Sequence, residues 1–310
     1  MKNKKLVFIT GTRADFGKLK PLIDVIENSD LFDCYIFATG MHTLKRYGHT
    51  YSEIKKQKYK NLSVYKNQKN SDHDLILADT IKGFSKFVKE IKPDMIIVHG
   101  DRLEPLAGAI VGLFKGVLVG HIEGGEISGT VDEIIRHSIT KLSHIHFVSN
   151  LEAKKRIMQM GENKRSSFII GSPEIEIMKE SILPKIQDTK MRYNIPYESY
   201  AIFIFHPVVT EFNSTRKQIK QIILGLKESK RKFVIIYPNN DKGSDIIIEE
   251  IKKLKGNKNF RTFPSLRFKY FLSLLKNADF VIGNSSTVVR EAEVYGTPAI
   301  NIGTRQNNRN

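Results

Sequence analysis

Apolar runs rich in β-branched residues alternate along the first half of the chain with segments in which apolar positions recur every three or four residues. The apolar runs cover residues 5–10, 34–38, 95–98, 116–120 and 144–148. The segments with helical spacing between them cover residues 18–27, 74–91, 105–113 and 132–142. This alternation is typical of βαβ units, and it predicts a mainly parallel sheet covered by helices.

The second half repeats the pattern after a break at residues 168–173. Its elements are apolar runs at 200–205, 232–237 and 280–282, and helical patterns at 216–228, 244–255, 268–277 and 287–295. The sequence therefore predicts an α/β protein with two Rossmann-like domains, residues 1–168 and 169–310, whose strand ends face each other across a cleft. Residues 300–310 form a strand-like run and a polar tail, so we expect C-terminal helices over the second sheet to be missing.

The composition, with 40% hydrophobic and 27% charged residues, is that of an ordinary globular protein. The single cysteine, Cys34, excludes an intramolecular disulfide and favours the cytoplasm. No uninterrupted apolar run is long enough to cross a bilayer, so we expect no membrane insertion. The formal net charge of +17 is compatible with nucleic acid or a phosphorylated substrate. Lysine pairs along helical segments favour solvated helix faces instead, and without a nucleic-acid-binding motif we expect no nucleic acid partner.

A turn containing glycine follows the first predicted strand. Residues 11–17 read GTRADFG and open the first predicted helix. The N–H groups of a helix N-terminus and the guanidinium of Arg13 suit a phosphate. The spacing matches neither the dinucleotide-binding nor the Walker pattern, so a purely structural turn is an equal alternative.

A second turn of small residues, GNSST at 283–287, follows the strand at 280–282. The hydroxyl and N–H groups of Ser285 and Ser286 suit a diphosphate, and Glu291 in the next helix suits ribose hydroxyls. Arg305 follows the next strand at the same sheet edge. The alternative is a simple N-cap serine, but the recurrence of the turn in both halves favours phosphate binding.

Acidic residues are concentrated between residues 98 and 137 of this basic chain. Asp101 and Glu123 each come directly after a buried strand, whereas Asp132 lies at the N-terminus of a predicted helix. Two acids at neighbouring strand ends favour catalysis. Asp132 also suits the helix dipole whatever its function, and Asp101 suits an ion pair with Arg102.

Further polar candidates follow other strands. His206 lies at the first strand end of the second domain, and Asn239 lies in a turn whose amides suit a base edge, although a plain turn is an alternative. His144 and His146 share one strand face without an evident third ligand, so we expect hydrogen-bonded histidines and no metal.

Together these motifs resemble the hydrolysing UDP-N-acetylglucosamine 2-epimerases of bacterial sialic-acid and capsule biosynthesis. The resemblance covers essentially the whole chain. It is carried by GTRADFGKL at 11–19, HGDR at 99–102, HIEGGEISGTVD at 121–132, FHPV at 205–208, YPNND at 237–241, GNSS at 283–286 and GTRQ at 303–306. The family fold has two Rossmann-like domains of the GT-B type, in agreement with the hydrophobic pattern.

The resemblance implies that UDP lies mainly on the second domain. The binding residues it implies are Ser285, Ser286, Glu291 and Arg305 around the diphosphate and ribose, Asn239 near uracil, and Arg13 from the first domain. The catalytic residues it implies are Asp101, Glu123, Asp132 and His206.

The expected reaction converts UDP-N-acetylglucosamine and water to N-acetylmannosamine and UDP, by elimination to a glycal and hydration, as the first step of sialic-acid synthesis. It needs carboxylates on different sides of the sugar ring and no cofactor, and the role of each acid stays open. Alternatives are the same chemistry on a UDP-2,4-diacetamido sugar, a non-hydrolysing epimerase, and a GT-B glycosyltransferase. A nucleic-acid-binding protein is a further alternative that only the net charge supports. We also expect a homo-oligomer, either a dimer or a tetramer.

Overall fold

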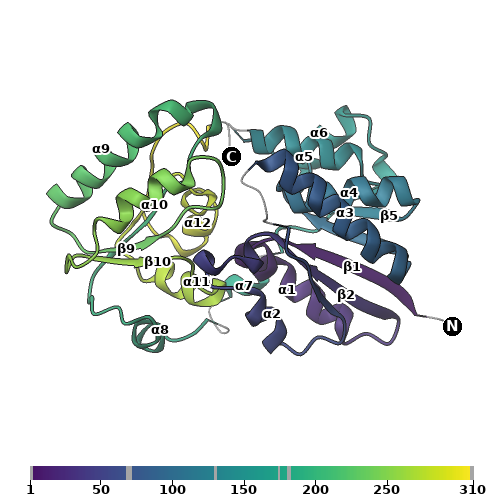
Figure 1. The fold of residues 1–310 in the computed structure, drawn as a ribbon, viewed down its shortest axis with the longest axis horizontal. Coiled ribbons are helices and arrows are strands. Elements are labelled where there is room, and N and C mark those ends of the chain that lie inside the picture. Colours follow the sequence, from purple (N-terminus) through teal and green to yellow (C-terminus); the bar gives the residue numbers. More distant parts are fainter. Residues whose placement is uncertain (1–2, 68–71, 129–130, 174, 180–182, 308–310) are drawn as a thin grey trace. The chain divides into compact units, whose positions relative to one another are not determined.

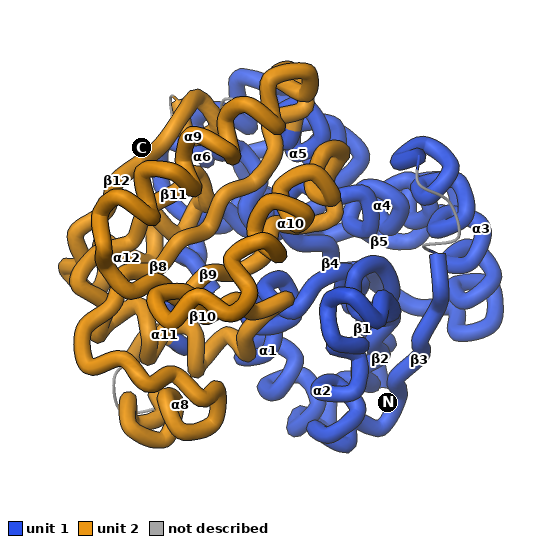
Figure 2. The backbone as a smooth tube through the Cα atoms, turned by 60° about the vertical axis from the view of Figure 1, so that its left-hand side comes forward, with its two compact units in different colours: residues 1–127, 132–177 blue, residues 128–131, 178–310 orange. Residues whose placement is uncertain are grey.

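The computed structural model describes residues 3–67, 72–128, 131–173, 175–179 and 183–307 (Figure 1). The chain forms two compact units, residues 1–127 with 132–177 and residues 128–131 with 178–310 (Figure 2). The units divide after residue 177 rather than 168, because strand β7 (Ser167–Ile169) pairs with β6 (Ile145–Val148) and extends the first sheet. Gly129 and Thr130 of the predicted acidic motif, and residues 308–310 of the tail, lie outside the described residues.

The first unit contains a parallel sheet whose described strands follow the order β3-β2-β1-β4-β5-β6-β7. The remaining strands are β1 (Lys4–Thr10), β2 (Phe32–Ala38), β3 (Leu62–Val64), β4 (Met95–His99) and β5 (Leu118–Ile122). The strand order reverses between β1 and β4, which are hydrogen-bonded neighbours. In a doubly wound sheet, ligands bind beyond the carboxyl ends of the strands at such a switch point.

Both faces of this sheet are covered, because successive residues of a strand point to opposite sides. Val7 and Ile9 of β1 pack in one core with residues of α3 and α4, whereas Phe8 packs in another core with residues of α1. The helices of this unit are α1 (Arg13–Glu27), α2 (Tyr51–Lys56), α3 (His73–Ile91), α4 (Leu103–Lys115), α5 (Val131–Lys141), α6 (Leu151–Gln159) and, at its end, α7 (Ile175–Met178).

The second unit repeats this plan with the strand order β10-β9-β8-β11-β12. Its strands are β8 (Ala201–Ile204), β9 (Phe233–Ile236), β10 (Phe260–Phe263), β11 (Val281–Gly283) and β12 (Ala299–Asn301). Its helices are α8 (Ile186–Tyr193), α9 (Thr215–Glu228), α10 (Ser244–Lys252), α11 (Phe268–Lys276) and α12 (Glu291–Tyr295). The switch point lies between β8 and β11, where Gly283 has φ +145° and a Cβ would lie 1.8 Å from the carbonyl oxygen of Ile204. Only glycine permits this approach of the two strands.

The α/β fold class with two Rossmann-like units is confirmed, and the strands and helices expected from the hydrophobic pattern are present. One element differs. The helix expected at 287–295 is a 3₁₀ turn (Ser286–Val288) followed by the short helix α12. The residues Thr287, Val288 and Val289 are β-branched, which lowers helix propensity at this point.

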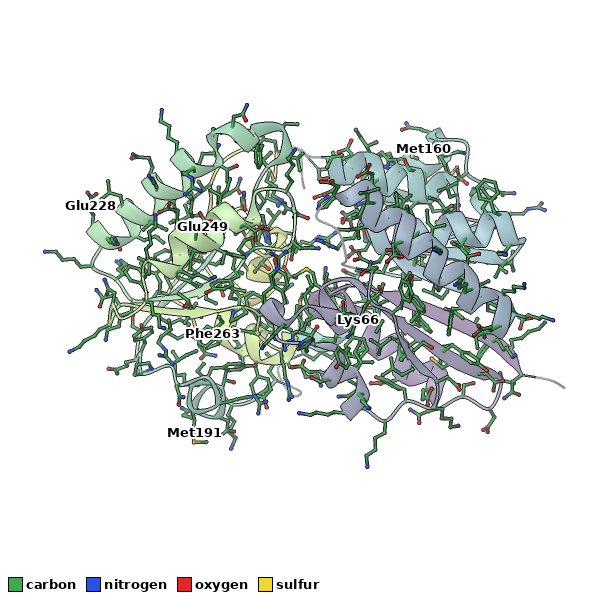
Figure 3. All side chains as sticks on the ribbon, viewed as in Figure 1. Lys66, Met160, Met191, Glu228, Glu249 and Phe263 are labelled. Atoms are coloured by element: carbon green, nitrogen blue, oxygen red, sulfur yellow. The ribbon has the colours of Figure 1, made fainter. Side chains whose placement is uncertain are left out.

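Charged side chains point outward from the helices of both units (Figure 3). Glu228 of α9 and Glu249 of α10 are exposed, and Glu249 forms an exposed ion pair with Arg216 at 3.0 Å. This arrangement agrees with charged residues lying on solvated helix faces. In the part of the chain that the structure describes, no helix combines the length and the apolar character of a bilayer-spanning segment.

Candidate active site

The turn after β1 is held by its own side chains. Thr12 is the N-cap of α1, and its hydroxyl accepts a hydrogen bond from the N–H of Asp15 at 3.1 Å. The Asp15 carboxylate accepts from the Thr10 hydroxyl at 2.7 Å and from the Gly11 N–H at 3.1 Å. A Cβ on Gly11 would lie 2.5 Å from the side chain of the buried Glu104. These hydrogen bonds hold the turn, and a side chain at its first position would displace that of Glu104.

Arg13, which the sequence places toward a diphosphate, pairs with an acid of its own unit. Its Nη2 lies 2.6 Å from Oε1 of Glu53 in α2, and the two side chains are only 16% and 19% exposed. Glu53 thus orients Arg13, and this ion pair occupies one terminal nitrogen of the Arg13 guanidinium.

Glu123 follows β5 in a backbone conformation that few residues adopt, with φ +66°. Its N–H donates to the carbonyl oxygen of Phe147 at 3.0 Å, which anchors the turn to β6. Its buried carboxylate lies between His99 and Lys18, with Oε2 3.4 Å from Nε2 of His99 and Oε1 3.7 Å from Nζ of Lys18. Such strain and such close partners are features of functional positions.

His99, the last residue of β4, lies between two carboxylates. Its Nδ1 is 3.0 Å from Oδ1 of Asp15, and its Nε2 faces Glu123. Burial alone would lower the pKa of this imidazole, but the charges of Glu123 and Asp15 outweigh burial and raise the pKa to about 10. The two carboxylates therefore favour the charged form of the ring.

Asp101, in the turn after β4, is paired with Arg136 of α5. One terminal nitrogen of Arg136 donates to Asp101, and the other donates to the carbonyl oxygen of Glu126 at 2.9 Å. The Arg136 side chain is 1% exposed and that of Asp101 is 26% exposed, so Asp101 is the accessible end of this pair. His121 Nε2 donates to the Gly100 carbonyl oxygen of the same turn at 2.9 Å, and burial lowers the His121 pKa to about 3, so this ring is neutral.

Asp132 lies in the first turn of α5, as expected, four residues before Arg136. Residues four apart share a face of a helix. Asp132 therefore lies on the side of α5 from which Arg136 binds Asp101.

In the second unit, Asn284 fixes the backbone of His206. The His206 N–H donates to Oδ1 of Asn284 at 2.6 Å, and Nδ2 of Asn284 donates to the His206 carbonyl oxygen at 2.8 Å. Nδ1 of His206 accepts from the backbone N–H of Asn239 at 3.1 Å. In the neutral ring the proton is consequently on Nε2, which makes that atom a donor.

The turn after β11 combines a structural cap with a buried acid. Ser285 is an N-cap residue whose hydroxyl accepts from the Thr287 N–H at 3.4 Å, and Ser286 begins the 3₁₀ turn. Glu291 is 3% exposed, and its Oε2 has no hydrogen-bond partner among the described residues. A buried polar oxygen without a partner costs free energy of folding, so this atom is suited to accept a hydrogen bond from a ligand hydroxyl.

Two residues after β12 also contact the backbone of this turn. Nη1 of Arg305 lies 3.4 Å from the carbonyl oxygen of Asn284, and Nε2 of the buried Gln306 donates to the same oxygen at 2.8 Å. Asn284 therefore connects Arg305 and Gln306 with His206.

The model of the UDP-N-acetylglucosamine 2-epimerase family matches residues 24–310. The chain belongs to this family. A UDP-N-acetylglucosamine 2-epimerase of Neisseria meningitidis is 49% identical over 307 residues, which cover 99% of this chain and 81% of that protein. A relative from Legionella pneumophila, named UDP-N,N'-diacetylbacillosamine 2-epimerase (hydrolyzing), is 32% identical over 99% of this chain and 82% of its own.

Solved structures of family members share the fold. That of the Methanocaldococcus jannaschii UDP-GlcNAc 2-epimerase in complex with UDP-GlcNAc and UDP has a TM-score of 0.81 and covers 97% of this chain and 84% of that one. Its sequence identity is 22%, so it supports the two-unit architecture alone.

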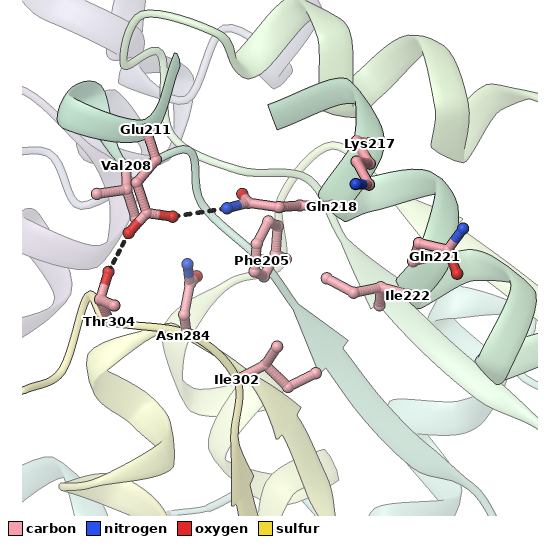
Figure 4. Close-up of a pocket in the computed structure, with 11 residues that line it drawn as sticks. Phe205, Val208, Glu211, Lys217, Gln218, Gln221, Ile222, Asn284, Ile302 and Thr304 are labelled. Carbon is pink, nitrogen blue, oxygen red and sulfur yellow. Dashed lines mark hydrogen bonds between the residues drawn. The ribbon is translucent and has the colours of Figure 1, made fainter. Parts of the chain in front are cut away.

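This member of the epimerase family has a cavity of about 340 Å³ in its second unit (Figure 4). Apolar side chains, including Phe205, Ile222 and Ile302, form part of its lining. The carboxylate of Glu211 accepts from Nε2 of Gln218 at 2.6 Å and from the hydroxyl of Thr304. From the predicted phosphate-binding turn at 283–287, Asn284 lines this cavity. Ser285 and Glu291 do not line it.

His146 of β6 and His144, just before this strand, are hydrogen-bonded, as expected. Nε2 of His146 lies 3.0 Å from Glu162, and Nδ1 of His144 accepts from the Val119 N–H at 3.1 Å. Over the described ranges, no group of three or more acidic, histidine or cysteine side chains is arranged to hold a metal ion.

Several residues of the site were not predicted from sequence, although they lie in or beside the quoted motifs. They are Asp15, Lys18, His99, Arg136, Asn284 and Gln306. Helical spacing carried a usable signal, namely that residues three or four apart share one face of a helix. Lys18 lies three residues after Asp15 on α1, and Arg136 lies four residues after Asp132 on α5. The roles of His99 and Asn284 depend on strand neighbours distant in sequence.

Proposed function

We propose that the protein is a hydrolysing UDP-N-acetylglucosamine 2-epimerase, which converts UDP-N-acetylglucosamine and water to N-acetylmannosamine and UDP. The 49% identity to the Neisseria enzyme supports this substrate. The name of the Legionella relative, at 32% identity, supports the use of water. N-acetylmannosamine is a sialic-acid precursor, so we place the reaction at the first step of sialic-acid synthesis.

The observation that carries the proposal is the pair of acids at adjacent strand ends. β4 and β5 are parallel neighbours with His99 in register with Ile122, so Asp101 and Glu123 emerge at the same sheet edge. One acid is held by Arg136, and the other lies beside His99. Inversion at a carbon through elimination and addition needs one group that takes a proton and another that returns one. Two carboxylates with different cationic partners suit these roles.

The chemistry follows from the substrate. The C2 proton has no adjacent carbonyl to acidify it, so its removal is coupled to departure of UDP. The C1–O bond breaks, UDP takes the electron pair, and a carboxylate takes the C2 proton from the oxocarbenium-like centre to give a glycal. Water then adds at C1, and an acid delivers a proton to the opposite face of C2. We assign these transfers to Asp101, Glu123 and Asp132, with Nε2 of His206 as a hydrogen-bond donor.

The second unit supplies the proposed UDP site. Ser285 and Ser286 offer hydroxyl and N–H groups to the diphosphate, and the unpartnered Oε2 of Glu291 is suited to a ribose hydroxyl. Arg305 and, from the first unit, Arg13 would neutralise charge on the departing UDP. Asn239 is assigned to the uracil end.

One incubation tests the reaction. In deuterated water, UDP-N-acetylglucosamine is expected to give free UDP and N-acetylmannosamine with one deuterium at C2, as identified by NMR and mass spectrometry. A product that retains UDP would show a non-hydrolysing epimerase. Absence of deuterium would exclude elimination, and a requirement for an acceptor would indicate a glycosyltransferase.

A second candidate substrate is UDP-N,N'-diacetylbacillosamine, which the name of the 32% identical Legionella relative supports. It would undergo the same elimination and hydration. Comparing kcat/KM for the two sugar nucleotides in the same assay decides between them.

We also propose that the enzyme is a cytoplasmic homo-oligomer, a dimer or a tetramer. The buried free thiol of Cys34 suits a reducing compartment. Leu113 and Phe114 in the last turn of α4 and Leu118 at the start of β5 are exposed, Phe114 by 82%. Such apolar surface suits burial against a second copy. Light scattering that gives the mass of a single chain at micromolar concentration would contradict the oligomer.

A further inference from the structure

His99 is held between an anchored acid and Glu123. Asp15 accepts hydrogen bonds from the Thr10 hydroxyl and the Gly11 N–H through Oδ2, and its Oδ1 faces Nδ1 of His99. A carboxylate with this set of donors is an acceptor, so Nδ1 of His99 carries a proton.

The hydrogen bonds behind Asp15 run in a consistent direction. Thr10 uses its proton toward Asp15, so its oxygen accepts from Nε2 of His42 at 3.1 Å. Nδ1 of His42 in turn accepts from the Thr50 hydroxyl at 2.7 Å. Burial lowers the pKa of His42 to about 4, which agrees with the neutral ring that this pattern needs. Each hydrogen bond of this network is therefore donated in the direction of Asp15, and Asp15 only accepts.

The other nitrogen of His99 faces Glu123. With Nδ1 protonated, Nε2 presents either a lone pair or an N–H to the carboxylate oxygen 3.4 Å away. A lone pair facing a carboxylate is repulsive, whereas an N–H on a cationic ring is attractive. Nε2 makes no hydrogen bond to another described residue, so the contact with Glu123 is electrostatic, and it favours the imidazolium form.

We propose that His99 is a positioning residue that keeps Glu123 ionised and oriented for proton transfer in the reaction proposed above. It acts through Glu123 and leaves the UDP-binding groups untouched. The inference rests on the proposed function for its catalytic consequence, but the charge state of His99 is measurable without turnover.

Other charged groups around Glu123 set the size of the effect. Lys18 of α1 lies 3.7 Å from its carboxylate, and Arg136 of α5 interacts with it from farther away while binding Asp101. His121 of β5 is neutral, since its pKa is about 3. Loss of His99 would leave Lys18 as the near cation, so we expect Glu123 to become easier to protonate without losing its charge entirely.

The first experiment follows the imidazole directly. Two-bond ¹H–¹⁵N correlation spectra of the wild-type protein should show His99 with both nitrogens protonated up to about pH 8, well above the usual titration range near 6.5. The Glu123→Gln variant should move the His99 titration to lower pH. A wild-type His99 that is neutral at pH 7 would overturn the proposal, whatever reaction the protein catalyses.

The second experiment measures the catalytic consequence. His99→Gln should shift the acid limb of the kcat profile to higher pH by about one unit, so that kcat falls about tenfold at low pH, while KM changes less than about twofold. His146→Gln is the matched control, because His146 is likewise buried in the same sheet but bonds Glu162. An unchanged acid limb in His99→Gln, or the same shift in His146→Gln, would contradict positioning by His99.

Discussion

The two switch points of this molecule are built from the same strand order but held by different interactions. In the first unit, ion pairs such as Arg136 with Asp101 and His99 with Glu123 hold the predicted catalytic acids. In the second unit, the neutral amide of Asn284 fixes the backbone of His206. Acids that exchange protons need a controlled charge around them, whereas a turn that binds a nucleotide needs backbone groups held in place. This difference matches the roles that we propose for the two units, proton transfer in the first and UDP binding in the second.

The sharpest test of this division is Glu123→Gln. The substitution keeps the size of the side chain but removes the group proposed to exchange a proton, so kcat should fall by about 10³-fold. UDP affinity, measured by calorimetry, should stay within about twofold because the UDP site is assigned to the second unit. Asp101→Asn should lose activity to a similar degree. It should also lower the free energy of unfolding by about 1–3 kcal/mol, since Arg136 is buried and loses its charged partner.

Near wild-type turnover in Glu123→Gln would remove the acid from the mechanism. Glu152→Gln provides the control for a change in net charge, because Glu152 is an exposed acid on α6 of the same unit. Its kcat should be unchanged.

Asn284→Ala tests the neutral half of the comparison. The variant leaves the N–H and the carbonyl oxygen of His206 buried without their partner, so we expect a loss of about 2–4 kcal/mol in the free energy of unfolding, measured with urea. UDP affinity should fall as well, because the turn that loses its side-chain bonds to His206 also carries the backbone carbonyl oxygen that Arg305 and Gln306 contact. Asn277→Ala is the control, since its exposed side chain bonds one carbonyl oxygen of α11. Equal stability losses in both variants would show that the two hydrogen bonds from Asn284 to the His206 backbone stabilise the fold no more than one exposed hydrogen bond does.

The sequence predicts the fold better than it predicts the interactions within the site. The alternation of apolar runs and helical patterns is a local signal, and it identified the strands that end at His99 and Ile204. The pairing of Arg13 with Glu53 joins residues 40 positions apart, and that of His206 with Asn284 joins residues 78 apart. No local pattern encodes such partners. Asp101 and Glu123 could be predicted as candidates because each comes just after a strand, whereas the part proposed for His99, at the end of its strand, depends on Asp15 and Glu123, which are distant in sequence.

Glu291→Gln should give a smaller effect that is confined to binding. A neutral amide is a weaker acceptor than a carboxylate, so we expect UDP to bind about tenfold more weakly, with little change in stability. The control is Glu293→Gln, an exposed acid two residues further along α12, which should bind UDP like the wild type. If Glu291→Gln retained full UDP affinity, the unpartnered oxygen would have to serve something other than the ribose.

Glu53→Gln tests whether the charged environment of the first unit extends to nucleotide binding. The amide oxygen of glutamine still accepts from Arg13, so the guanidinium keeps its orientation, but the negative charge that competes with a diphosphate is removed. We expect UDP to bind about threefold more tightly at low salt, and the gain to shrink as salt screens the charges. Calorimetry at two salt concentrations measures both effects, with Glu152→Gln again as the control for net charge. Weaker binding would mean that the charge of Glu53 is needed to hold Arg13, and that the ion pair is part of the binding site rather than a competitor of the ligand.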